Sequence, residues 1–97
     1  MINYIIHVSF ADAAPDTILR FSIELSKYGI AAGVKADDGR AYHLPPGTYT
    51  YVGKETINDV RDGVHRLAET IQTGASVLVI EATTLSWSGL KEVPVAA

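Results

Sequence analysis

The feature that most constrains the fold is an apolar stripe at helical spacing in the second half of the chain. The stripe consists of Ile57, Val60, Val64, Leu67 and Ile71. This spacing places the side chains on one face of an α-helix, which needs another layer to cover it. Residues 56–59 (Thr-Ile-Asn-Asp) resemble a capping box with Asp as its last residue, and Gly74 ends the predicted helix. Gly63 costs this helix roughly 1 kcal/mol relative to Ala, which predicts close packing there.

One more helix and four strands complete the predicted pattern. Apolar residues recur at helical spacing from Ile18, with Leu19 and Ile23 widening the stripe, and Gly29 ends this helix. Four segments rich in β-branched, aromatic or small residues are the predicted strands: 4–10, 30–36, 48–52 and 76–82. Turn sequences at 37–39 and 45–47 bracket residues 40–44, which we expect to continue extended.

The order strand, helix, strand, strand, helix, strand predicts the fold class. Its compact solution is an α+β, ferredoxin-like βαββαβ fold: a four-stranded antiparallel sheet with two helices on one face. The length of 97 residues suits one domain. We place that domain at residues 1–84 and a C-terminal tail at 85–97, which is a candidate for an added strand.

Composition limits the classes of function. The chain has no cysteine, so it forms neither disulfides nor thiolate metal sites. It shows no signal-type N-terminus and no apolar run long enough to span a membrane, so we expect a cytoplasmic location and no membrane partner. The net charge of −3 and the scattered basic residues favour a protein or small-molecule partner over nucleic acid.

Several side chains are candidates for a functional site, although some of them also have a purely structural interpretation. Asp12 follows the first predicted strand and serves either as a reactive carboxylate or as a helix cap. Tyr49 and Tyr51 alternate on the third predicted strand, as base-stacking aromatics do, although paired strand tyrosines more often pack across strands. His7 is a candidate binding residue on the sheet. The histidines lack the spacing of metal ligands, so we predict no metal site and no cofactor.

Short strings along the chain resemble the GhoS family of antitoxins. They are residues 4–10 followed by Asp12, Ile18-Leu19-Arg20-Phe21, and Val34-Lys35-Ala36-Asp37 leading to Gly39 and Leu44. The similarity continues through the strand at 48–52, the second helix and residues 80–87. It implies a ferredoxin-like fold, similar to that of small CRISPR-associated endoribonucleases, and cleavage of a toxin's messenger RNA. Asp12 and Arg20 match the positions that would act on RNA: Asp12 as a base or metal ligand, and Arg20 as a phosphate contact. Ala11 separates Phe10 from Asp12, whereas the family has the aspartate directly after the phenylalanine.

The sequence therefore supports two main hypotheses and leaves open whether the chain is an enzyme. One is a GhoS-like antitoxin that acts on RNA, which alone would call for a divalent metal. The other is a non-enzymatic inhibitor from a phage or mobile element, for example an anti-CRISPR protein, that binds a host or mobile-element protein through its sheet face or acidic surface. A third is a dimer that binds a small ligand between its sheets. The predicted uncovered face (Ile5, His7, Val77, Val79) is apolar enough to favour a homodimer.

Overall fold

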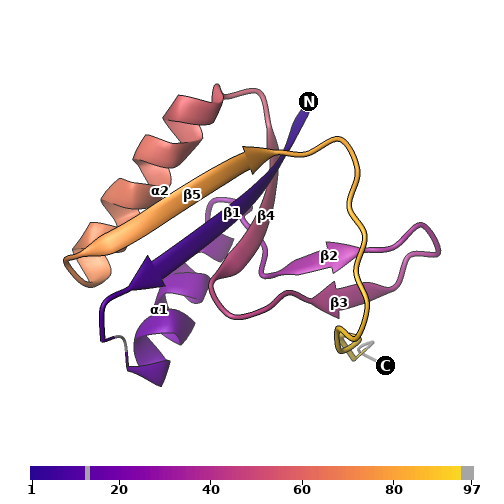
Figure 1. Ribbon diagram of the computed structural model, residues 1–97, viewed down its shortest axis with the longest axis horizontal. Coiled ribbons are helices and arrows are strands. Elements are labelled where there is room, and N and C mark those ends of the chain that lie inside the picture. The colour runs from indigo at the N-terminus through magenta and orange to yellow at the C-terminus, as the bar shows by residue number, and fades with distance from the viewer. Residues whose placement is uncertain (13, 95–97) are drawn as a thin grey trace.

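The computed structural model describes residues 1–12 and 14–94, which form two helices and five strands. In chain order the elements are β1 (Ile2–Phe10), α1 (Pro15–Ser26), β2 (Gly33–Lys35), β3 (Ala41–His43), β4 (Thr48–Gly53), α2 (Ile57–Ile71) and β5 (Ala75–Glu81) (Figure 1). The α+β class and both predicted helices are confirmed.

The main sheet has three antiparallel strands in the order β4-β1-β5. The prediction of a four-stranded sheet is wrong, because β2 pairs with β3 in a separate two-stranded sheet. Only Ala31, just before β2, forms an isolated bridge with Thr50 of β4. The turn at 37–39 folds β2 back on β3. Within it Asp38 Oδ1 accepts a hydrogen bond from the Arg40 amide at 2.9 Å, and Gly39 adopts φ +88°.

The C-terminal tail adds to the small sheet. Glu92 bridges Tyr42 of β3, and two backbone hydrogen bonds of 2.8 Å flank the bridge: His43 N to Lys91 O and Val93 N to Ala41 O. The Tyr42 and Trp87 rings lie 5.7 Å apart between centroids. The tail therefore extends the β2–β3 hairpin on the far side of β3, away from the main sheet (Figure 1). Residues 95–97 of the predicted tail lie outside the described residues.

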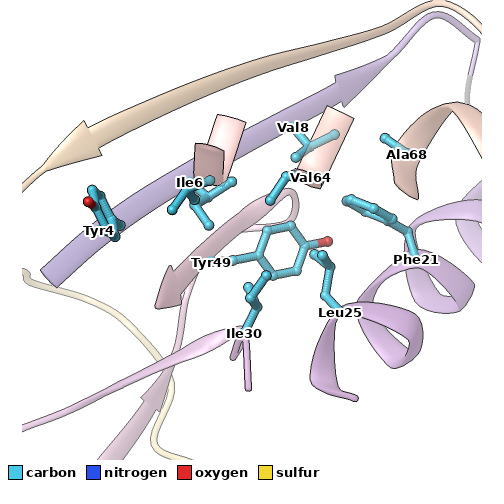
Figure 2. Packing of buried hydrophobic residues seen from close by; sticks show 10 residues of the cluster. Tyr4, Ile6, Val8, Phe21, Leu25, Ile30, Tyr49, Val64 and Ala68 are labelled. Atoms are coloured by element: carbon cyan, nitrogen blue, oxygen red, sulfur yellow. The ribbon is translucent and has the colours of Figure 1, made fainter. Parts of the chain in front are cut away.

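Both helices cover one face of the main sheet. The core cluster joins one side of β1 (Tyr4, Ile6, Val8) to α1 (Phe21, Leu25), α2 (Val60, Val64, Ala68), Ile30 and Tyr49 (Figure 2). Burial of these side chains is the main stabilising contribution, at about 25 cal/mol per Å² of apolar surface. The predicted inward face of β1 is thus confirmed, and its other face is left without a helix.

The first helix begins differently from the prediction. Its N-cap residue is Ala14, which makes no side-chain cap hydrogen bond, and Pro15 takes the first helical position. Asp12 is not the cap: it lies in a turn with φ +54°, a left-handed conformation that aspartate tolerates better than most residues. Leu19 and Ile23, which the sequence assigned to the apolar stripe, are 61% and 53% exposed.

The second helix matches its predicted start. The hydroxyl of Thr56 accepts a hydrogen bond from the Asp59 amide at 3.2 Å, as an N-cap does. The expectation of close packing at Gly63 is wrong, because a Cβ added there would meet no atom within 4 Å. Neither helix in the described part of the chain is long and apolar enough to cross a membrane.

Candidate functional site

The side of the main sheet away from the helices is the principal candidate surface, which we call the open face. The strand register places ten side chains on it: Asn3, Ile5, His7, Ser9, Thr48, Thr50, Val52, Ser76, Leu78 and Ile80. The largest exposed apolar members are Val52, Leu78 and Ile80, at 49%, 58% and 48% exposure. Ile80 pairs with the half-buried Ile5 and lies two residues from Leu78 on the same side of β5, and contiguous exposed apolar patches typically mark a site of interaction.

The sequence predicted this face correctly for two of the four residues assigned to it. Ile5 and His7 lie on it, but Val77 and Val79 point to the helix side, opposite Val8 and Ile6 of β1. Their neighbours Leu78 and Ile80 take the open positions. Alternation alone could not decide between the two sets, because β5 is apolar on both faces; only the pairing register with β1 does.

The open face carries no Asp, Glu, Lys or Arg side chain. His7 is its one titratable group, exposed, with its ring Nδ1 3.3 Å from the Thr48 hydroxyl. The face is therefore nearly neutral in a protein whose net charge is −3. Apolar and small hydroxyl side chains without charges suit contact with another protein surface, whereas binding of nucleic acid depends on Lys and Arg at the phosphates.

A hollow of about 980 Å³ lies at one end of the open face. Its walls come from Ile5 and Val52 of the sheet, Lys35 of β2, and Leu85 and Trp87 of the segment after β5. Thr50 fixes one of these walls, because its hydroxyl donates a 2.7 Å hydrogen bond to the Gly33 carbonyl. The hairpin and tail thus flank the open face without covering Leu78 or Val52.

The two tyrosines predicted to bind lie on the helix side of the sheet. Tyr49 is opposite Ile6 and only 1% exposed, and its hydroxyl lies 2.9 Å from that of Ser22. The Phe21 ring meets it edge-on, with centroids 5.8 Å apart. Burial raises the pKa of Tyr49, and the hydrogen bond with Ser22 partly offsets this. Its ring fills the core, so it has no free face on which a base could stack.

Tyr51 lies at the edge of the same side. Its ring stacks on Tyr4 with centroids 6.4 Å apart, and its hydroxyl donates a 2.6 Å hydrogen bond to the Glu55 carboxylate. That hydrogen bond is the main reason why the pKa of Tyr51 is raised. The structure therefore separates Tyr49 and Tyr51 from His7, which projects from the opposite face of the sheet.

The residues predicted to act on RNA are both at the surface. Asp12 is exposed in the turn after β1, and Arg20 is exposed on α1. No hydrogen bond or ion pair joins them among residues 1–12 and 14–94. Within the same residues, no three His, Asp or Glu side chains are grouped so as to hold a metal ion. Among the described residues, no hydrogen bond or ion pair thus fixes the orientation of either side chain.

A second hollow lies on the helix side, between α1 and α2, with a volume of about 470 Å³. Its lining includes the apolar side chains Leu25, Tyr28, Ile30, Val64 and Leu67, and the polar residues Glu55, Asp59 and Arg66. The volume is in the range typical of small-molecule sites. We call this hollow the interhelical groove.

Comparisons with models of protein families and with characterised proteins find no match for this chain. The likeness to GhoS therefore rests on the short strings in the sequence, and the functional assignment rests on the geometry of the open face and of the groove.

Proposed function

We propose that this chain is a non-enzymatic regulatory protein that binds another protein through the open face. The observation that carries the proposal is the combination of three exposed apolar side chains with the lack of Asp, Glu, Lys and Arg on that face. The core of a protein–protein interface is typically depleted in charged residues and apolar at its centre. Val52, Leu78 and Ile80 supply such a centre, and the serine and threonine side chains around them supply a polar rim.

The partner that fits this face is a folded protein with an exposed apolar patch. Because the chain is acidic as a whole, a basic protein would be drawn toward it, and the neutral face would then form the close contact. Small acidic inhibitors encoded by phages and other mobile elements, including anti-CRISPR proteins, are of this physical type. The cytoplasm is the location that we expect for such a function.

An RNA-acting, GhoS-like antitoxin is the second candidate, and one observation favours it. The main sheet runs β5-β1-β4, and the bridge between Ala31 and Thr50 puts the segment before β2 next to β4. Extended by one strand, this is the strand order of a ferredoxin-like sheet, which the resemblance to GhoS implies. We propose the ferredoxin-like fold on that basis, with β2 diverted into the hairpin. Asp12, Arg20 and a divalent ion would carry the chemistry in this candidate only.

Capture from host lysate by variants of the tagged protein tests the first candidate. We expect the wild-type protein to retain one stoichiometric protein, and Val52→Lys and Leu78→Lys to lose it. The matched control is Leu19→Lys, which places the same charge at an exposed apolar residue of α1, 61% exposed in the wild-type protein. The control should retain the partner, and all variants should keep the wild-type circular dichroism spectrum. The proposal would be contradicted if Leu19→Lys lost the partner while Val52→Lys and Leu78→Lys retained it.

An RNase assay separates the two candidates. The first predicts no cleavage of RNA with Mg²⁺ or Mn²⁺ present. Metal-dependent cleavage that is lost in a folded Asp12→Ala variant would instead establish the second candidate.

A further inference from the structure

Gly63 stands at a position that the folded chain alone does not explain. A glycine in the interior of a helix lowers helix stability relative to alanine. A Cβ at Gly63 would meet no atom within 4 Å outside the adjoining backbone of α2, so none of the other described residues packs against the bare backbone. Gly63 is also one of the residues that line the interhelical groove. The bare stretch of backbone therefore faces the groove, where it leaves room for a ligand to approach α2 closely.

The rest of the groove combines an apolar floor with carboxylates at one end. Leu25 and Ile30 contribute to the floor from the α1 side, and Val64 and Leu67 from α2. Glu55 and Asp59 lie at the end where α2 begins. Neither carboxylate forms an ion pair with a Lys, Arg or His among the described residues. The Glu55 carboxylate accepts a hydrogen bond from the Tyr51 hydroxyl, and the Glu55 main-chain carbonyl accepts one from Tyr4.

The charges along the groove are separated. Arg66 follows Asp59 by two helical turns, which is about 10 Å along the axis of α2. The backbone of Arg66 is therefore distant from that of Asp59, and no ion pair joins Arg66 to either carboxylate among the described residues. The field at the carboxylate end also acts on Tyr4: burial is the main cause of its raised pKa, and the charges of Glu81, Glu55 and Asp59 raise it further.

We propose that the interhelical groove binds a small organic ammonium ion, with the apolar body of the ligand over Gly63 and its charged end at Glu55 and Asp59. The apolar floor would bury the hydrocarbon part, since a volume of about 470 Å³ accommodates a small molecule. The carboxylates complement a cation, and the exposed ring of Tyr28 and the half-buried ring of Tyr51 would add a cation–π contribution. The site is independent of the proposed protein-binding function, because it lies on the opposite side of the sheet from the open face.

The experiment is a titration of the ¹⁵N-labelled full chain with three probes of similar size: 2-phenylethylamine, 2-phenylethanol and 3-phenylpropionate. We expect saturable shifts of the Gly63, Val64 and Tyr51 amide signals with the amine, at least tenfold weaker binding of the alcohol, and no binding of the carboxylate. Equal affinity for all three probes, or no saturable shift with the amine, would overturn the proposal.

Variants then test the two features on which the site depends. Glu55→Gln together with Asp59→Asn should weaken amine binding at least tenfold. The control Glu69→Gln removes a carboxylate of α2 that is not among the groove-lining residues and should leave the affinity unchanged. Gly63→Ala should raise the urea midpoint of unfolding and still weaken the amine at least tenfold. Because this variant is expected to be more stable than the wild type, loss of binding could not be attributed to misfolding. Unchanged affinity in Gly63→Ala would overturn the role given to the bare backbone.

Discussion

Replacement of Tyr49 distinguishes a core residue from a ligand-stacking residue. Tyr49 is 1% exposed, and its hydroxyl lies 2.9 Å from that of Ser22. The Ser22 hydroxyl also donates to the Ile18 carbonyl at 2.9 Å. Tyr49→Phe removes one hydrogen bond from a packed site, which costs about 1 kcal/mol of unfolding free energy.

Tyr49→Ala removes the whole ring. Truncation of a buried aromatic residue to alanine costs ~3–5 kcal/mol. We expect the upper half of this range, because the edge-on contact with Phe21 is lost as well. A domain of this size is stabilised by only ~5–15 kcal/mol in total, so the alanine variant should lose a large fraction of its stability.

Urea denaturation followed by circular dichroism measures both effects. With a slope of about 2 kcal/mol per M, the midpoint should fall by ~0.5 M for Tyr49→Phe and by ~2 M for Tyr49→Ala. The control is Tyr28→Ala, which truncates a ring that is 63% exposed and should change stability by no more than about 0.5 kcal/mol. If Tyr49→Ala unfolds at the same urea concentration as Tyr28→Ala, then Tyr49 is not a core residue and our assignment of the two sheet faces is wrong.

Two further predictions concern glycines and alkaline pH. Gly63→Ala should stabilise the protein by about 0.5–1 kcal/mol in urea denaturation. Gly47→Ala should destabilise it by more than ~1 kcal/mol, because Gly47 has φ +83° and a Cβ there would lie 2.6 Å from the Val8 carbonyl oxygen. If Gly47→Ala were instead the more stable variant, the structure of the 45–47 turn would be contradicted. Since the folded state raises the pKa of Tyr49, stability should be constant up to the ordinary tyrosine pKa of 10.0 and fall as pH rises through the raised value. Tyr49→Phe should make this fall shallower, and an unchanged slope would show that Tyr49 does not contribute to it.

The parts of the fold that the sequence predicts correctly are those in which one periodic pattern has one structural solution. The stripe containing Val60 and Val64 specifies both the existence of α2 and the face that it buries. In β1 the large apolar residues Tyr4, Ile6 and Val8 alternate with residues that, apart from Ile5, are polar, which correctly predicts the buried face.

The incorrect predictions concern pairing between distant segments. Residues 30–36 have a strand-like composition, but a three-residue β2 pairs with β3 across a tight turn and so leaves the main sheet after the single bridge at Ala31. The Asp-Asp-Gly turn at 37–39 favours the hairpin with β3, but nothing local in the sequence shows whether residues 30–36 also pair along β4. The same limit applies to β5, where Leu78 and Val79 are both apolar and only the register with β1 decides which is exposed.

The candidate site was predictable only in part for the same reason. His7 and Ile5 were found because the pattern of β1 is unambiguous. Val52, Leu78 and Ile80 were missed, since each stands in a strand whose outward face depends on the pairing. Tyr49 and Tyr51 were candidates for base stacking, whereas the pairing with Ile6 and Tyr4 turns both rings toward the helices.

Site-specific photo-crosslinking in host cells tests the central claim most directly. A photoreactive phenylalanine analogue would replace Leu78 on the open face in one variant and Leu19 on α1 in the other, since both side chains are more than half exposed. We predict an adduct with one other protein from the Leu78 position and none from the Leu19 position. An adduct with RNA, or a protein adduct from the Leu19 position alone, would contradict the account of the open face as the protein-binding surface.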